Sequence, residues 1–330
     1  MKWPLVVLLV SQAAAHVAVS PCVESDYIRG LTPKERGLTP NGGVVNGPLA
    51  AQVMLDRAGF SPGEIDGRAG RNLQRALVAF QRVQGLPVTG GVDEATWTAL
   101  SNRAGGQPPL VTHVITPEDL AGPFVAVPAD VMAQSTLETL GYSSPLEELA
   151  ERFHASPQLL EELNPGAVFD VAGARLVVPN VAAIDPLAPL PGSRPDATIV
   201  VSKATSALTV EDKDGALLFH APVTTGSRHD PLPLGTWKVT GVERMPPFHY
   251  NPRLFWDADA SHAKARIAPG PNNPVGTVWI DLTKPHYGIH GTPEPGRIGH
   301  VQSHGCVRLT NWDANRVAQW ARPGMQVVFK

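Results

Sequence analysis

Apolar residues recur with two different spacings along this chain, helical in its first half and strand-like in its second. The clearest helical face consists of four apolar side chains at i, i+3, i+4 and i+7, which are Leu73, Ala76, Leu77 and Phe80. Two further helices are predicted over residues 49–58 and 93–100, and turn-forming residues separate the three helices. Residues 45–104 are therefore predicted to form a small three-helix domain.

A second helical pair is predicted by capping signals between residues 144 and 166. Residues 144–147 (SPLE) form a capping box with proline at the first helical position. Another helix is predicted to begin at Ser156 and Pro157 and to end at residues 164–166 (NPG). A short strand follows over residues 174–178, and its partner strand is expected within residues 111–127.

From residue 197 onward the apolar runs become short or alternating, a pattern typical of β-strands. Strands are predicted over four segments, residues 199–201, 208–210, 217–219 and 237–239. Residues 212–215 (DKDG) predict a hairpin turn, and one helix is predicted near residues 312–320. Residues 197–330 are therefore predicted to form a mostly β domain, preceded by a semi-rigid, proline-rich linker over residues 182–196.

The N-terminal residues predict export of the protein. Lys2 precedes a short apolar run over residues 4–10, and residues 13–15 (AAA) suit a signal-peptide cleavage site, so residues 1–15 are predicted to be a signal peptide. The run is too short to span a bilayer, so no transmembrane anchor is expected. Residues 16–44 are rich in proline, glycine and polar groups and are predicted to be a flexible lead-in.

Charge and cysteine content narrow the choice of partner and chemistry. The formal net charge over 330 residues is −3 and no basic run occurs, so nucleic acid is not expected as a partner. Two cysteines in an exported protein raise the alternative of a disulfide between Cys22 and Cys306. The Gly, His and Ser neighbours of Cys306 instead favour a reactive thiol, which a disulfide would silence.

The candidate chemistry therefore concentrates around Cys306. A thiol nucleophile needs a base to raise its thiolate fraction, and His290 and His304 are the candidates close to it in sequence. His290 is predicted to end a strand and to approach from a neighbouring strand. The backbone N–H groups of Gly305 and Cys306 are candidates for an oxyanion hole, because glycine lets the backbone come close to a developing oxyanion.

The sequence around these residues resembles the catalytic domain of L,D-transpeptidases of the YkuD or ErfK type. The resemblance rests on residues 287–292 (YGIHGT) and 303–309 (SHGCVRL) and extends over residues 196–330. It implies that Cys306 is the nucleophile, that the carbonyl of Gly291 orients His290 as its base, and that no metal or cofactor is needed. It also implies a set of residues that line the site or bind substrate: His304, Arg308, Ser303, Tyr287 and Thr292. Among these, Arg308 is expected to meet a substrate carboxylate.

The resemblance implies a reaction on peptidoglycan in the periplasm or cell wall. The thiol would attack the carbonyl of the third residue of a tetrapeptide stem and release the terminal D-alanine. An amine of a second stem would then accept the acyl group, which makes a 3–3 cross-link. An outer-membrane lipoprotein or water is the alternative acceptor, and water would make the site an L,D-carboxypeptidase.

The two upstream regions also resemble units that bind the cell wall. Residues 63–67 (GEIDG), 79–81 (AFQ) and 85–90 (GLPVTG) look like the three-helix peptidoglycan-binding domain of cell-wall enzymes. The helix–helix–strand order within residues 111–181 resembles a LysM-type module, with a longer segment after its first strand than that family usually has. A plain linker domain is the alternative for this second region.

Three alternative functions are weighed against the transpeptidase. A zinc site would use the dense candidate ligands His286, His290, His300, His304 and Cys306. His286 and His290 have the spacing of a helical H-x-x-x-H pair, but the glycines around His290 disfavour a helix there. Papain-like and NlpC-type peptidases place their cysteine before the histidine, the reverse of the order here. A non-catalytic wall-binding protein would have no need of an activated thiol.

Three other features are interpreted without reference to the cysteine motif. The tryptophans Trp97, Trp237 and Trp279 are expected in the core, because tryptophan is strongly buried on average. His229 is expected in a surface loop. Residues 245–273 are predicted to be a lid or substrate loop, because long segments without regular structure are usually functional.

Overall fold

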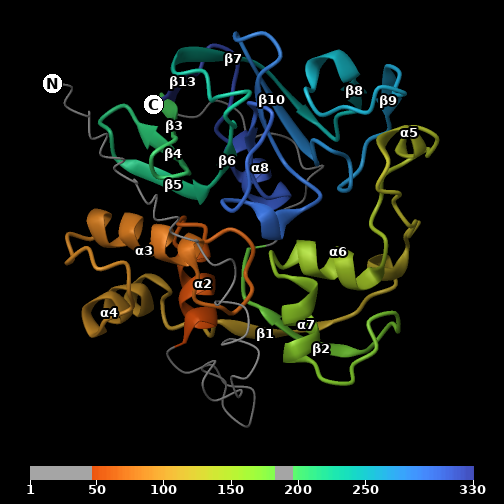
Figure 1. The fold of residues 1–330 in the computed structure, drawn as a ribbon. Coiled ribbons are helices and arrows are strands. Elements are labelled where there is room, and N and C mark those ends of the chain that lie inside the picture. The colour runs from red at the N-terminus through yellow and green to blue at the C-terminus, as the bar shows by residue number, and fades with distance from the viewer. Residues whose placement is uncertain (1–46, 183–195) are drawn as a thin grey trace, which may run out of the picture.

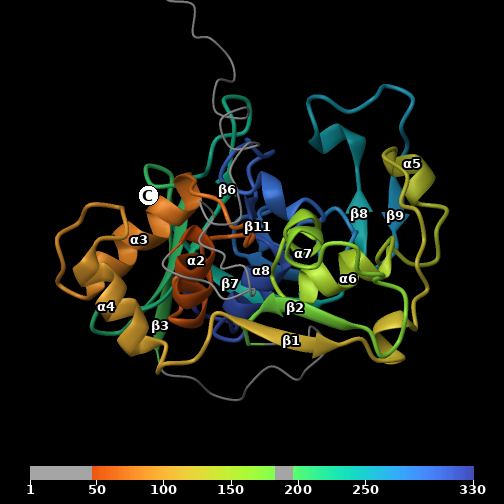
Figure 2. The same cartoon turned by 90° about the horizontal axis from the view of Figure 1, so that it is seen from below.

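The computed structural model describes residues 47–182 and 196–330, which form three adjoining parts (Figures 1 and 2). A helical part and a small α/β part lie side by side, and a larger β-rich part covers both. The predicted signal peptide, the lead-in with Cys22, and residues 183–195 of the predicted linker lie outside the described residues.

The first part consists of three helices, α2 (Pro48–Arg57), α3 (Arg71–Val83) and α4 (Glu94–Arg103). Phe60 and Phe80 meet edge to face in its core, with ring centroids 5.4 Å apart. The buried Gln81 amide accepts hydrogen bonds from the N–H groups of Thr89 and Gly90 and donates to the carbonyl of Gly91. One buried amide therefore ties the turn after α3 to the helix, which explains why this motif needs a glutamine.

The second part has the order strand, helix, helix, strand. Strands β1 (Leu110–Val114) and β2 (Arg175–Pro179) form an antiparallel pair, and helices α6 (Pro145–Arg152) and α7 (Pro157–Leu163) belong to the same core. The predicted caps are confirmed, because Ser144 accepts from the N–H of Glu147 and Ser156 accepts from the N–H of Leu159. A long segment between β1 and α6 contains the 3₁₀ helix η1 (Glu118–Leu120) and the short helix α5 (Val131–Gln134).

The third part is built on a nine-stranded sheet with the order β5-β4-β3-β13-β7-β10-β11-β12-β6. Its strands are β3 (Ala197–Ser202), β4 (Ala207–Asp212), β5 (Leu217–Pro222), β6 (Thr224–Thr225), β7 (Gly235–Arg244), β10 (Val278–Leu282), β11 (Gly288–His290), β12 (Val307–Arg308) and β13 (Gln326–Phe329). The two edge strands β5 and β6 are separated in sequence by Val223 alone, so the sheet curls back toward itself. The four predicted strands and the predicted hairpin turn are confirmed.

Helix α8 (Asn311–Ala318) closes the core of this sheet. Its buried residues Ala314, Val317 and Ala318 pack with Ile289 of β11 and Val307 of β12. A second, two-stranded sheet of β8 (Phe248–Tyr250) and β9 (Ala265–Ile267) stands beside it, and two 3₁₀ helices, η2 (Pro252–Leu254) and η3 (Pro295–Arg297), complete this part. Within the residues that the structure describes, no helix is long and apolar enough to cross a membrane.

The three parts are joined by buried polar contacts. His154, which follows α6, lies between Asp56 of α2 and Thr310, with its ring nitrogens 3.1 Å and 3.2 Å from their oxygens. The imidazole also stacks on Trp312 of α8 at 4.9 Å. Because Asp56, His154 and Thr310 come from different parts, these contacts fix the parts relative to one another.

Glu151 of α6 supplies another contact between the parts, and its charge is costly there. Its Oε1 accepts a hydrogen bond from Asn311 Nδ2 of α8 at 2.9 Å. Burial raises the pKa of this carboxyl from its ordinary value of 4.5 to about 7, although the hydrogen bond from Asn311 opposes the shift. The folded protein therefore loses stability through Glu151 as the pH rises from 4.5 to 7 and the carboxyl ionises.

We expect Glu151→Gln to remove this pH dependence, because glutamine keeps the acceptor for Asn311 and cannot ionise. Above pH 7 the free energy of unfolding of the variant should exceed that of the wild type by about 2 kcal/mol. This figure is the pKa shift converted to free energy and reduced for the partial solvent exposure of the side chain. At pH 4.5 the variant and the wild type should be equally stable. Urea unfolding at both pH values measures this difference. The exposed Glu138→Gln is the matched control, and an equal gain at both pH values would contradict the prediction.

Candidate active site

A row of side chains crosses the central strands on one face of the sheet. In register, Glu243 of β7 pairs with Trp279 of β10, Trp279 with His290 of β11, and His290 with Arg308 of β12. Successive residues of a strand face opposite sides, so their neighbours Ile280, Ile289 and Val307 point into the core instead. Cys306 lies in the bend directly before β12 and lines the same pocket as His290 and Arg308.

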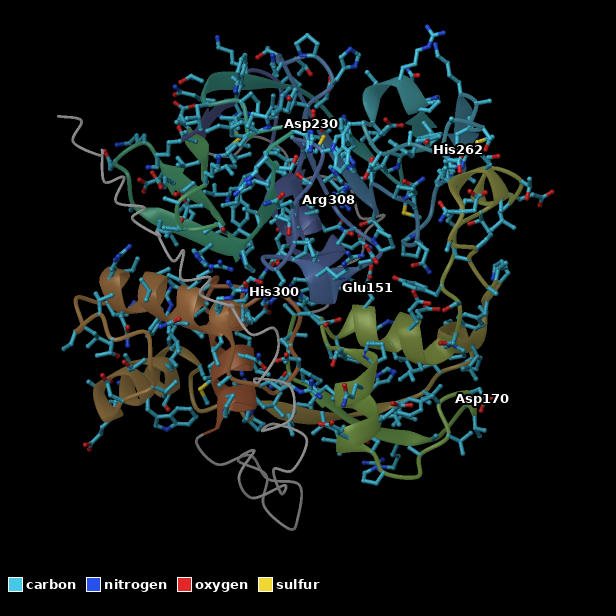
Figure 3. The ribbon with its side chains drawn as sticks, viewed as in Figure 1. Glu151, Asp170, Asp230, His262, His300 and Arg308 are labelled. Atoms are coloured by element: carbon cyan, nitrogen blue, oxygen red, sulfur yellow. The ribbon has the colours of Figure 1, made fainter. Side chains whose placement is uncertain are left out.

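This face forms the floor of a pocket of about 660 Å³. Its walls come from the β8 region, from the segment around His286 and Tyr287, and from α5. The lining includes Cys306, His290, His304, Arg308, Tyr287, Trp279, Glu243, Asp230, Phe248, Tyr250, Phe255 and Gln134. Figure 3 shows Arg308 and Asp230 in the middle of the β-rich part, and His262 beside α5. The pocket therefore brings together the predicted Cys306, His290, His304, Arg308 and Tyr287.

His290 is buried and held in one orientation. Its Nδ1 lies 2.7 Å from the carbonyl oxygen of Gly291, so Nδ1 carries the proton and donates it, which leaves Nε2 free as an acceptor. The ring stacks on Trp279 at 5.4 Å. Burial and the positive charge of Arg308 together lower the pKa of His290 to about 3, although the hydrogen bond to Gly291 opposes the shift. His290 is therefore a neutral imidazole at physiological pH.

The amide of Asn311 fixes the backbone that holds His290. Its Oδ1 accepts hydrogen bonds from the N–H groups of Thr277 and Thr292, each at 3.1 Å, and its Nδ2 donates to the carbonyl of Pro271. A side chain at Gly276 or Gly291 would collide with this buried amide. The glycine of the HGT motif is therefore required by the approach of Asn311, and the position of the Gly291 carbonyl follows from it.

Cys306 is a free thiol among the described residues. It donates a long, weak hydrogen bond to the carbonyl of His286, with Sγ and O 3.9 Å apart. Burial raises the pKa of the thiol, while the backbone N–H of Gly288 and the positive charge of Arg308 oppose that shift. The thiol is therefore protonated at neutral pH and needs a base to remove its proton during a reaction.

His304 and Gly305 shape the edge of the pocket beside Cys306. The Nε2 of His304 lies 2.7 Å from Oδ1 of Asp257, and its ring lies against Phe255. Gly305 has a φ of 102°, and a Cβ there would press into the Tyr287 ring. Glycine is thus the residue that fits this position.

Two predicted substrate-binding residues lie outside the pocket lining. Ser303 is buried and donates its hydroxyl hydrogen to the carbonyl of Cys306 at 2.7 Å. Thr292 is buried as well, and its hydroxyl accepts from the N–H of Glu294. Both hydroxyls bond to the backbone next to the thiol and the imidazole, and a role of these two residues in substrate binding stays a prediction.

Two expectations need correction. Trp279 lines the pocket over His290 and is not a core residue, whereas Trp97 and Trp237 do pack against their cores. Residues 245–273 line the pocket as predicted, but they carry the β8–β9 sheet and are not without regular structure. His229 is exposed as expected and stacks on Trp256 at 4.4 Å.

The sequence-based prediction missed Asp230, Glu243 and Gln134 at the pocket. None of them lies near the cysteine motif in sequence. Glu243 reaches the pocket through the register of β7, and Gln134 reaches it through the packing of α5. Asp230 and Arg308 each have a buried polar side-chain atom, Oδ2 and Nε, without a hydrogen-bond partner in the described part of the chain. A bound molecule with complementary polar groups would satisfy both.

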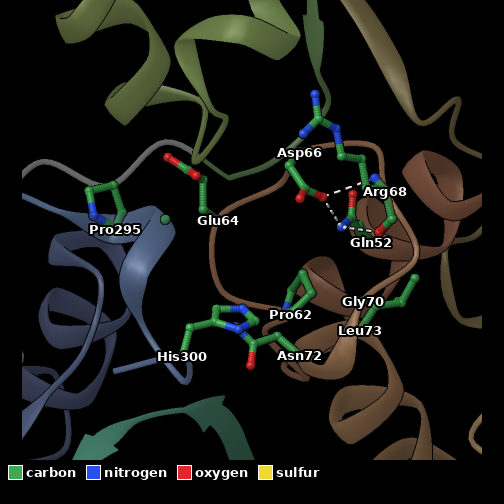
Figure 4. Close-up of a pocket in the computed structure, with 11 residues that line it drawn as sticks. Gln52, Pro62, Glu64, Asp66, Arg68, Gly70, Asn72, Leu73, Pro295 and His300 are labelled. Atoms are coloured by element: carbon green, nitrogen blue, oxygen red, sulfur yellow. Dashed lines mark hydrogen bonds between the residues drawn. The ribbon is translucent and has the colours of Figure 1, made fainter. Parts of the chain in front are cut away.

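His300 belongs to a different place. It lines a small hollow of about 60 Å³ between the helical part and η3, together with Glu64 and Asn72 (Figure 4). His300 therefore lies apart from His286, His290 and His304, which line the main pocket. The histidines of the zinc alternative are thus divided between two places. Among the described residues no group of three or more His, Cys, Asp or Glu side chains is placed to hold a metal ion.

Comparison with known families agrees with this arrangement. Residues 196–329 match the model of the L,D-transpeptidase catalytic domain, and residues 46–100 match that of the "Putative peptidoglycan binding domain". The "Putative L,D-transpeptidase YkuD" of Bacillus licheniformis is 28% identical over 184 residues, which span 55% of this chain and 91% of that protein. The "Putative L,D-transpeptidase YqjB" of Bacillus subtilis is 31% identical over 147 residues, 43% of this chain and 73% of that protein.

A solved structure was also found. L,D-transpeptidase 3 of Mycobacterium tuberculosis, with a faropenem-derived adduct, aligns with 48% of this chain and 75% of its own at 18% identity and a TM-score of 0.35, too low to support an argument. By the match of its sequence to the family model, the β-rich part is an L,D-transpeptidase catalytic domain. The chain belongs to the L,D-transpeptidase family, and it carries a peptidoglycan-binding domain upstream of the catalytic one.

The burial of His290 leads to a prediction for its titration. Because its pKa lies near 3, the side chain should remain neutral at pH 5, with its proton on Nδ1. Side-chain nitrogen chemical shifts in NMR spectra report this directly, and the His290→Gln variant assigns the signal. Replacing Arg308 by Met removes a nearby cation and should move the titration to higher pH. A wild-type His290 signal that titrates between pH 6 and 7 would contradict the assignment.

Proposed function

We propose that Cys306 and His290 carry out acyl transfer on the tetrapeptide stem of peptidoglycan. The observation that carries this proposal is that a thiol and a neutral imidazole with a free Nε2 line one pocket. Nε2 takes the thiol proton as Sγ attacks the carbonyl carbon of the third stem residue. The bond to the terminal D-alanine then breaks, and the imidazolium returns the proton to the leaving amine.

The remaining residues of the pocket suit the charges of such a substrate. Arg308 presents a guanidinium next to the thiol, and we assign it to a carboxylate of the stem peptide. The N–H groups of Gly305 and Cys306 are the proposed oxyanion hole, and His304 and Tyr287 line the walls. In the second half-reaction an amine attacks the thioester, His290 takes its proton, and the sulfur of Cys306 leaves.

The acceptor decides the product. An amine of a second stem gives a 3–3 cross-link, a lipoprotein amine gives attachment to the wall, and water gives L,D-carboxypeptidase activity. The pocket of about 660 Å³, with acidic side chains at Asp230 and Glu243, favours a cationic amine as the acceptor. We therefore propose transfer to a stem amine as the main reaction.

The upstream parts suit an enzyme that works within the wall. The family and its peptidoglycan-binding domain imply peptidoglycan as the substrate and the cell envelope as the location. We propose export by the N-terminal signal peptide to the periplasm or cell wall. We also propose that residues 111–181 form a LysM-type glycan-binding module, supported by their strand, helix, helix, strand order and antiparallel strand pair.

We expect Cys306→Ala to abolish acylation by a carbapenem, whose strained β-lactam carbonyl traps a nucleophilic thiol. Intact-protein mass spectrometry measures the adduct. Cys22→Ala is the matched control, because it removes the other cysteine of the sequence, and it should be acylated like the wild type. An adduct on Cys306→Ala would place the nucleophile elsewhere. A wild type without any adduct would favour the non-catalytic wall-binding alternative.

Incubation with tetrapeptide muropeptides distinguishes the acceptors. We expect free D-alanine together with a cross-linked dimer in mass spectra of the products. Tripeptide with D-alanine and no dimer would instead identify a carboxypeptidase. Both products should be missing with Cys306→Ala, since one thiol serves both reactions.

Binding of the wall is tested separately from catalysis. The Cys306→Ala protein should sediment with insoluble peptidoglycan, and soluble glycan strands should compete for part of this binding through the LysM-type module. A chain that stays in the supernatant at physiological salt would contradict a binding role for the upstream parts.

A further inference from the structure

One wall of the active-site pocket comes from the upstream α/β part. Residues 115–144 lie between β1 and α6 in sequence, yet they extend to the catalytic domain, where α5 lies beside β9 (Figures 1 and 2). The pocket that contains Cys306 is lined by Ala129, Val131 and Gln134 from this segment. The segment is named the α5 wall below.

The α5 wall is attached to the catalytic domain by backbone hydrogen bonds. The N–H of Leu140 donates to the carbonyl of Pro269 at 2.9 Å, and its own carbonyl accepts from the N–H of Asn272 at 3.0 Å. Any side chain at Gly270 would collide with the Leu140 carbonyl. Because the two backbones approach closely and are buried at this contact, the α5 wall is held firmly against the catalytic domain.

Side-chain contacts also join the α5 wall to the β8–β9 region of the catalytic domain. Leu140 is buried together with Tyr250 and Ile267 of the β8–β9 sheet. The Nε2 of His262 lies 3.1 Å from Oδ2 of Asp130, and its Nδ1 lies 3.0 Å from the hydroxyl of Tyr250. His262 thus links Asp130, the residue before α5, to Tyr250, which lines the pocket.

Gln134 is the polar residue that the α5 wall adds to the pocket lining. Its Nε2 donates to the carbonyl of Pro128 at 2.8 Å, which fixes the amide and defines the direction of Oε1. Oε1 is buried and has no hydrogen-bond partner among the residues that the structure describes. A buried acceptor without a partner is unfavourable, and an N–H of a bound molecule would satisfy it.

We propose that the α5 wall determines substrate specificity, and that Oε1 of Gln134 accepts a hydrogen bond from an N–H group of the donor stem peptide. This inference rests on the proposed function of Cys306. Gln134 then acts together with Arg308, whose Nε also lacks a partner, so that an N–H and a carboxylate of one peptide are recognised from opposite sides of the pocket. The upstream α/β part, which carries the α5 wall, thereby takes a direct part in choosing the substrate.

The test compares Gln134→Leu with Gln134→Glu in the full chain. Leucine removes the acceptor, so KM for a tetrapeptide donor should rise about tenfold while kcat stays within about twofold. Glutamate keeps an acceptor oxygen and loses the donor to Pro128, so its KM should remain within about threefold of the wild type. Acylation by a carbapenem at saturating concentration checks that the thiol still reacts in both variants.

Controls separate the possible outcomes. Gln158→Leu, an exposed glutamine on α7, should leave KM unchanged, and thermal unfolding checks that each variant is folded. An unchanged KM in Gln134→Leu would overturn the inference, and so would equal losses in the leucine and glutamate variants, which indicate a structural role of the Pro128 contact. A wild type without turnover or adduct would overturn the proposed function itself, and this inference with it.

Discussion

The buried amide of Asn311 is the interaction on which the site depends. It bonds to backbone groups at Thr277, Thr292 and Pro271 and to the carboxyl of Glu151, so three separate segments of the chain converge on one side chain. Each bond contributes about 1 kcal/mol, but loss of the amide would leave several buried groups unpaired at once. The site therefore tolerates little change at this position.

The same amide explains the electrostatic state of the site. It positions the carbonyl of Gly291, which fixes the proton of His290 on Nδ1, while burial and Arg308 keep the ring neutral. Burial also keeps Cys306 protonated. Free enzyme therefore holds a neutral thiol and a neutral imidazole, and charge separates between them only as a carbonyl is attacked. A resting thiol of this kind is less prone to oxidation than a thiolate.

Local signals in the sequence were sufficient for the helices, the caps, the hairpin turn and the strand that carries His290. These features depend on neighbours within a few residues, such as Ser144 with Glu147. The core placement of Trp279 was wrong, because strand register, which no local signal gives, sets this side chain over His290 in the pocket. The position of Gln134 at the pocket could not be predicted from the sequence. It depends on contacts such as that between Leu140 and Pro269, which are 129 positions apart in the sequence.

The junction of the three parts ties both upstream parts rigidly to the catalytic domain. Asp56, His154 and Thr310 are held together by one buried imidazole, and Glu151 bonds to the amide that orders the catalytic site. A glycan strand bound to an upstream part would therefore lie at a fixed distance and orientation from the pocket. Domains joined by a flexible linker would instead sample many relative positions. The cost is a set of buried ionisable groups at the interfaces. That cost is reasonable for an enzyme whose substrate is an immobile network, since a rigid arrangement converts wall binding directly into substrate positioning.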